Sequence, residues 1–165
     1  MGSRFEETVM FKKGHLGEFL VDCKILQAGK FIPYAPVGGR AHPFDRLCAS
    51  KNKKNLMVVE VKTISTRAKV PYGYPDTGIS IKHYEDYLHV QEKYNIPVFL
   101  VFVDSHLKEI YGNKLDELKK ETSVIHRGKT LSYPRIESNF TAVGGKIIYF
   151  PLINMTHIYK LTEEE

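Results

Sequence analysis

The apolar positions of this chain form two continuous runs and several periodic stretches, and together they predict a mixed α/β domain. Residues 56–61 read LMVVEV, and residues 96–104 read IPVFLVFVD. Continuous apolar runs of this kind are typical of strands that are buried on both faces. Periodic positions at Leu16, Leu20 and Cys23 predict a helix whose apolar stripe faces the same core.

Glycines and aperiodic stretches indicate where the expected helices and strands begin and end. Gly14 is expected to separate two helices near the start of the chain, and Gly29 is expected to end the second. Residues 122–142 show no clear period. The expected elements are helices over residues 3–13, 15–28, 79–94 and 114–121, strands over residues 30–37, 56–61, 96–104 and 146–150, and a terminal helix. This order favours one α/β domain with a central mixed sheet flanked by helices.

Polar residues interrupt the first apolar run where they are costly to bury. Side chains alternate along a strand, so Glu60 and Lys62 share one face while Val61 points to the other. A buried carboxylate and a buried ammonium must pair or bind a metal. This requirement makes Glu60 and Lys62 candidates for chemistry.

A hairpin is expected to bring Asp45 to the same place. If the turn is formed by residues 52–55, Lys51 pairs with Leu56, and Asp45 lies across from Lys62 on the shared face. A five-residue turn would place Asp45 across from the residue before Lys62, on the opposite face. We therefore predict a four-residue turn, or an equivalent bulge.

Two carboxylates and one ammonium that converge in this way can hold a hard divalent cation and orient a water molecule. The spacing alone carries little weight, because Glu117 and Lys119 repeat it within KLDELKKE, where a solvated helix face is expected. The apolar strand and the preceding hairpin are what distinguish Glu60 and Lys62.

These residues also resemble a known family. Pro43-Phe44-Asp45 followed by Glu60-Val61-Lys62 is similar to the signature of the PD-(D/E)xK nuclease superfamily, although Phe44 departs from its strictest form. The order of helix, hairpin, helix and strand is most similar to small resolvase-type and phage-type nucleases. Residues 12–31, KKGHLGEFLVDCKILQAGKF, resemble their first helix and place Glu18 at the position of its acid. The resemblance covers roughly residues 12–104, so residues 105–165 are expected to be a C-terminal elaboration of one domain over residues 1–165.

The resemblance implies a restriction-endonuclease-like fold and a Mg²⁺- or Mn²⁺-dependent DNA endonuclease. Asp45, Glu60 and the carbonyl of Val61 would hold the metal, Lys62 would lie near the attacking water, and Glu18 would be an auxiliary acid, acting through water. Branched junctions and specific duplex sites, as in restriction or homing enzymes, are both open as substrates. A symmetric homodimer is the simplest way to cut two strands. A nucleic-acid-binding module without catalysis and a hydrolase of smaller phosphate esters are the alternatives.

Composition agrees with a DNA partner without requiring one. The formal charge is +5 over 165 residues, and 42% of the residues are hydrophobic. Two cysteines, Cys23 and Cys48, cannot build a four-Cys zinc site or an iron–sulfur cluster, and both are expected in the core. No apolar run is long enough for a membrane span, so we expect an intracellular, cytoplasmic protein, with a phage or mobile element as one origin.

Further cations lie near the predicted site or late in the chain. Lys82 and His83 begin the third expected helix and could face the site. The loop over residues 67–78 interleaves cations with rings, which suits DNA binding but equally suits an ordinary surface loop. Its candidate DNA contacts are Arg67, Lys69, Tyr72 and Tyr74. The charges of Arg127, Lys129 and Arg135 suit contacts to flanking DNA, although a solvated surface is the commoner role of such residues.

Overall fold

The computed structural model describes residues 9–26, 29, 31–35, 44–52, 54–64, 75–139, 142 and 144–162. Its helical elements are α1 (Val9–Val21), the π-helical turn η2 (Asp22–Leu26), α2 (Ile81–Tyr94), α3 (Leu115–Leu118) and the 3₁₀ turn η3 (Leu152–Asn154). Its strands are β1 (Phe31–Tyr34), β2 (Arg46–Ser50), β3 (Leu56–Ile64), β4 (Asp76–Ser80), β5 (Val98–Asp104), β6 (Glu109–Lys114), β7 (Thr122–His126), β8 (Lys129–Tyr133), β9 (Arg135–Ser138), β10 (Lys146–Pro151) and β11 (Thr156–Lys160).

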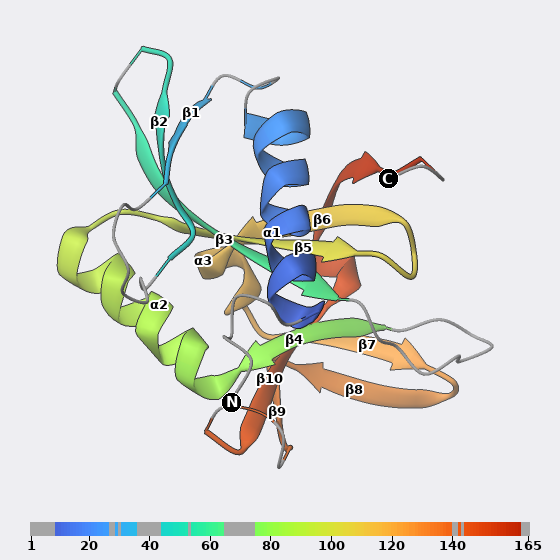
Figure 1. Ribbon diagram of the computed structural model, residues 1–165. Helices are drawn as coiled ribbons and strands as arrows, with labels where there is room; N and C mark the ends of the chain where they lie inside the picture. The colour runs from blue at the N-terminus through green and yellow to red at the C-terminus, as the bar shows by residue number, and fades with distance from the viewer. Residues whose placement is uncertain are drawn as a thin grey trace, which may run out of the picture.

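The main sheet has six strands in the order β1-β2-β3-β5-β6-β11. The central pair, β3 and β5, is parallel, and the other pairs are antiparallel. Helix α1 covers one face of this sheet, and α2 lies on the other face together with a second sheet of order β4-β10-β9 (Figure 1). The expected mixed sheet with helices on its faces is therefore confirmed.

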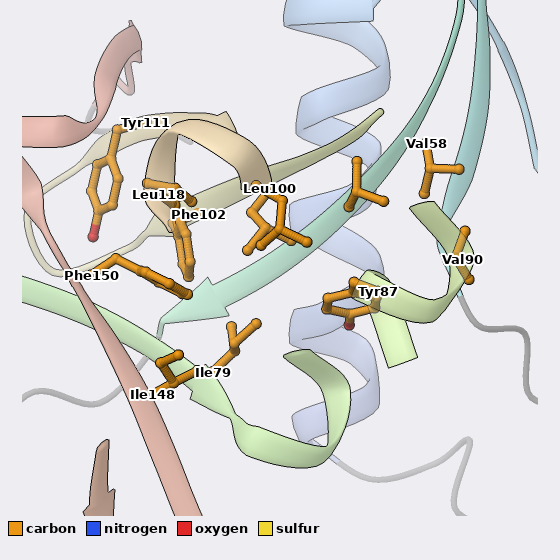
Figure 2. Close-up of a cluster of buried hydrophobic side chains, with 12 residues drawn as sticks. Val58, Ile79, Tyr87, Val90, Leu100, Phe102, Tyr111, Leu118, Ile148 and Phe150 are labelled. Carbon is orange, nitrogen blue, oxygen red and sulfur yellow. The ribbon is translucent and has the colours of Figure 1, made fainter. Parts of the chain in front are cut away.

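Alternation along β3 and β5 divides the core into two clusters. Val59 and Val61 face α1, where they pack with Leu20 and Val21. Val58 faces α2, in the larger cluster that contains Leu100, Phe102, Tyr87 and Phe150 (Figure 2). Since β3 is covered on both faces at Glu60, this carboxylate must find its partners inside the protein.

The N-terminal helix differs from the expectation at two points. Gly14 does not interrupt it, because α1 runs continuously through Gly14 to Val21. Leu16 is not a core residue but is 52% exposed, and Gly17 instead faces β3, where a Cβ would lie 2.1 Å from Oγ1 of Thr63. The close approach of helix and strand therefore rotates the buried stripe of α1 away from Leu16.

The C-terminal region also differs from the expectation. Residues 122–142 contain the β7–β8 hairpin and β9, and the terminal helix is absent from the described residues, where β11 pairs with β6 at the edge of the main sheet. Strand β10 is consequently not the last strand. Residues 76–78, expected in a loop, belong to β4. Among the described residues, no helix combines the length and the apolar character that a membrane crossing requires.

Candidate active site

The β2–β3 hairpin positions the predicted residues, in a register that differs from the expected one by two residues. Arg46 pairs with Val59, and the same alignment places Asp45 across from Glu60 rather than from Lys62. The turn does have four residues, but it spans residues 51–54, because the backbone N–H of Ser50 donates to the carbonyl of Asn55. A shift of two residues preserves the face, so the predicted grouping is retained.

Polar side chains explain this turn. Oγ of Ser50 lies 2.5 Å from Oδ1 of Asn52, and the same Oδ1 accepts from the backbone N–H of Lys54. Oγ of Ser50 also accepts from the N–H of Asn55. Asn and Ser stabilise turns through such local bonds, and here they close the loop one position earlier than expected.

Asp45 and Glu60 are joined by reciprocal bonds to the backbone. Oδ2 of Asp45 accepts from the N–H of Val61 at 2.7 Å, and Oε2 of Glu60 accepts from the N–H of Asp45 at 3.1 Å. Within the described residues, Oδ1 of Asp45 has no hydrogen-bond partner. The two carboxylates are thus held together beside β3, at the residue that directly precedes β2.

The second oxygen of Glu60 has two donors. Nζ of Lys62 and Oη of Tyr87 each lie 2.5 Å from Oε1, and the ammonium is 5.7 Å from the centre of the Tyr87 ring. Glu60 is only 5% exposed, so these donors replace the water that the carboxylate loses on burial. Tyr87 comes from the buried stripe of α2, and burial raises the pKa of its phenol, which therefore stays a donor.

Asp45 carries charge that its surroundings only partly offset. Burial and, after it, the negative charge of Glu60 raise the pKa of this carboxyl to about 6, against the lowering effects of the Val61 N–H, of Lys62 and of Arg46. A carboxyl with such a pKa gains from a nearby cation when it is ionised. This pair therefore provides an electrostatic reason to bind a positive ion.

Of the two predicted residues at the start of α2, Lys82 and His83, only His83 borders this group. Its ring lies 6.2 Å from that of Tyr87, and burial lowers its pKa, as does the positive charge of Lys62. Lys82 is exposed. The structure therefore brings His83 toward the site from α2 and leaves Lys82 at the surface.

Glu18 lies on the other face of the sheet and contacts Arg46. Nη1 of Arg46 donates to Oε2 of Glu18 at 3.1 Å and to the backbone carbonyl of Asp45 at 2.8 Å. The same guanidinium grips both carboxylate oxygens of Asp22 at 2.9–3.1 Å. Glu18 is thus linked to Asp45 through Arg46.

Tyr87 and Arg46 were not predicted from the sequence. Arg46 had a detectable signal, because alternation places it on the face opposite Asp45, toward α1, where Glu18 and Asp22 are four residues apart. Tyr87 had a weaker one: it lies three residues after Tyr84 on the apolar stripe of α2, and a buried phenol requires a partner.

The donors beside β3 are all oxygen atoms, as Mg²⁺ and Mn²⁺ prefer. They are the carboxylates of Asp45 and Glu60 and the carbonyl of Val61, which points to the same side as the N–H that Asp45 accepts from. No group of three or more His, Cys, Asp or Glu side chains suited to a metal exists among the described residues. The donor set fits a hard cation held by two carboxylates, a backbone oxygen and water.

Other predicted residues are placed as follows. Arg67, Lys69, Tyr72 and Tyr74 lie outside the described residues. Cys48 is fully buried in a core cluster, as expected, whereas Cys23 is only partly buried. The spacing shared by Glu117 and Lys119 falls on exposed side chains of α3 and the residue that follows it, which confirms that this repeat lacks the buried setting of Glu60 and Lys62.

No protein-family model matches the chain, and no curated protein matches it. Among solved structures, it is similar to Hjc, a Holliday junction resolvase from the archaeal hyperthermophile Archaeoglobus fulgidus, with 15% identity, a TM-score of 0.45, and coverage of 73% of this chain and 82% of that chain. It is also similar to D212, a nuclease from a fusselovirus, with 14% identity, a TM-score of 0.49, and coverage of 94% of this chain and 90% of that chain.

Proposed function

We propose that this chain is a divalent-metal-dependent DNA endonuclease that hydrolyses phosphodiester bonds at Asp45, Glu60 and Lys62. The observation that carries the proposal is the pair of hydrogen bonds that holds the Asp45 and Glu60 carboxylates together, with Nζ of Lys62 against the Glu60 carboxylate. If the ion pair of Lys62 and Glu60 served stability alone, it would not require the Asp45 carboxylate beside it. Asp45 has a raised pKa and few hydrogen-bond donors, as is common for carboxylates at functional sites.

Asp45, Glu60 and the carbonyl of Val61 would hold the metal. Mg²⁺ or Mn²⁺ held there would neutralise charge on the scissile phosphate and lower the pKa of an attacking water. Oδ1 of Asp45 is the first oxygen available to it, since Oδ2 is engaged by the Val61 N–H. Oε1 of Glu60 accepts from both Lys62 and Tyr87, so Lys62 would turn away from it if the cation were held at that oxygen.

Lys62 then becomes available for the substrate. The side chain of Lys62 is 28% exposed, whereas that of Glu60 is 6% exposed. A rotation of the Lys62 side chain would therefore bring its ammonium to a phosphate oxygen, or to the water that attacks the phosphate. Tyr87 keeps its bond to Glu60 during this movement, because its ring is fixed in the core. We thus propose that the Glu60 side chain keeps its position while the Lys62 side chain moves.

Glu18 is proposed as an auxiliary acid that would act on a second ion through water. Its bond to Arg46 provides a direct connection to the carbonyl of Asp45. In the structure Glu18 neutralises Arg46 together with Asp22, so Glu18 contributes by holding Arg46 against Asp45 as well.

For the substrate, we propose branched DNA cut by a symmetric homodimer. The motif-bearing layout is similar to resolvase-type nucleases, and two strands cut at once require two active sites. The decisive experiment is a nicking assay on supercoiled plasmid and on a four-way junction, with Mg²⁺, with Ca²⁺ and with EDTA. Cleavage in Mg²⁺ alone supports the proposal, and cleavage that survives thorough chelation contradicts it.

A further inference from the structure

The β7–β8 hairpin stands apart from both larger sheets. Its strands, Thr122–His126 and Lys129–Tyr133, form a sheet of their own and extend beside the body of the molecule (orange, Figure 1). The two-residue turn at Arg127 and Gly128 has positive φ at both positions, which matches the twist of a tight hairpin. Neither of the two core clusters contains a residue of this hairpin.

Its chemistry differs between its two faces. Residues that pair across the hairpin share a face. The inner face holds the pairs Thr122–Tyr133 and Val124–Leu131, all buried or half-buried. The outer face holds the pairs Ser123–Ser132 and Ile125–Thr130, all exposed, with Ile125 at 78%. Three hydroxyls and one apolar side chain are thus exposed on the outer face of the hairpin.

The charge of the hairpin is one-sided. Residues 122–133 include two cations and a histidine, Arg127, Lys129 and His126, and no Asp or Glu. Arg127 and Lys129 are exposed at the tip. The tip and the outer face therefore suit a polyanion.

The root of the hairpin is fixed to the element that leads into the active-site helix. Tyr133 is 2% exposed, and its Oη donates to Oδ2 of Asp76 at 2.6 Å. Nη2 of Arg135 donates to the same oxygen at 2.8 Å, and the guanidinium lies 5.0 Å from the ring centre of Tyr149. Asp76 begins β4, which runs directly into α2 and so to Tyr87. A ribbon anchored in this way has a fixed direction relative to the site.

We propose that the β7–β8 hairpin is a DNA-binding ribbon that enters the major groove of the substrate duplex. This inference rests on the proposed nuclease function. The major groove admits a two-stranded ribbon, Ser and Thr hydroxyls bond to base edges, and an apolar side chain contacts the thymine methyl. Ser123, Thr130 and Ile125 supply these groups. Arg127 and Lys129 contact the phosphates on either side.

Fluorescence anisotropy of a 30-base-pair duplex, titrated in EDTA at several salt concentrations, tests the ribbon. The test variant is Arg127→Asn with Lys129→Gln, because Asn accepts the positive φ of the turn. The matched control is Lys51→Gln with Lys54→Gln, which removes two exposed cations from the β2–β3 turn. We expect the test variant to bind on the order of tenfold more weakly and to lose about 1.8 from the slope of log affinity against log salt, at about 0.9 per phosphate contact. The control keeps the wild-type values.

A second variant, Ile125→Glu, tests the outer face, since its exposed position leaves the fold intact and places a carboxylate against the groove. It should weaken binding at least as much as the tip variant, with an unchanged circular dichroism spectrum. If the wild-type protein cleaves DNA in Mg²⁺ and both hairpin variants keep its affinity and salt slope, the proposed role of the hairpin is wrong and the proposed function stands. Loss of self-association in the Ile125 variant, with DNA affinity unchanged, also overturns that role and assigns the face to a second copy. Wild-type protein that neither binds nor cleaves DNA overturns the ribbon together with the proposed function.

Discussion

Oη of Tyr87 donates a 2.5 Å hydrogen bond to Oε1 of Glu60, the same oxygen that Nζ of Lys62 contacts. This bond joins the helix on one face of the sheet to the strand that carries the proposed metal ligand. It gives Glu60 a fixed position whether or not Lys62 stays against it. The relationship therefore separates a carboxylate that holds its place from an ammonium that can move.

Replacing Tyr87 with Phe should lower the free energy of unfolding by about 1–3 kcal/mol, because a nearly buried carboxylate loses a donor. Urea denaturation measures the change. The matched control is Tyr84→Phe, three residues earlier on α2, whose ring packs on Phe150. An equal effect of the two substitutions would show that the bond to Glu60 contributes nothing of its own.

Replacing Asp45 with Asn should stabilise the metal-free protein above pH 6 and leave its stability unchanged near pH 4. The pKa of Asp45 in the folded state, about 6, lies above the ordinary 3.8, so the folded state favours the protonated form. The wild-type protein therefore loses stability as the pH rises from about 4 to about 6 and Asp45 ionises. Removal of this charge should restore on the order of 1–2 kcal/mol of the free energy of unfolding.

Urea denaturation in EDTA at pH 4.0 and pH 7.5 tests this prediction. Added Mg²⁺ should then stabilise the wild-type protein and leave the Asp45 variant unchanged, because a ligand that binds only the folded state raises stability. A gain of the same size at both pH values would contradict the raised pKa.

Arg46→Met should lower the free energy of unfolding by about 1–3 kcal/mol, since Glu18 and Asp22 would remain half-buried without their shared cation. It should also slow DNA cleavage, because Arg46 binds the carbonyl of Asp45. Arg46→Lys, which keeps the charge but not the planar fork, should lie between wild type and Arg46→Met. Equal stability of Arg46→Lys and wild type would show that the fork is unnecessary.

Gly17→Ala should destabilise the protein by about 1–3 kcal/mol, because the added methyl group meets Oγ1 of Thr63 and pushes α1 away from β3. Gly14→Ala, on the same helix but with nothing within 4 Å, should instead add up to about 1 kcal/mol through helix propensity. Thermal unfolding of the two variants distinguishes these signs. Stabilisation by both would mean that the approach of α1 to β3 is looser than described.

The buried strands and the shared face of Asp45, Glu60 and Lys62 could be predicted because they depend on alternation, a property of the local chain. The register could not, since it depends on which Ser and Asn side chains close the turn. Two residues of slip moved Asp45 from Lys62 to Glu60 without moving it off the face. The face on which a strand residue lies is thus more predictable than the residue that lies across from it.

Contacts between distant segments account for the other differences. Gly14 is tolerated inside α1 because the helix is held by its packing on β3 near Gly17, not by propensity at each residue. Residues 122–133 form strands in which exposed positions alternate with buried or half-buried ones, so they lack the apolar run that identified β5. Strand β11 is exposed at an edge and pairs only with β6, which no local pattern indicates.

The central claim is that Lys62 and the two carboxylates beside it cut DNA, and the rate of plasmid nicking in Mg²⁺ by Lys62→Ala tests it most directly. The control is Glu117→Ala with Lys119→Ala, which removes the same pair of residue types from an exposed site. We predict that Lys62→Ala slows nicking at least about 100-fold while binding DNA as wild type does, and that the control nicks at the wild-type rate. Wild-type nicking by Lys62→Ala, or an equal loss in the control, would contradict the account.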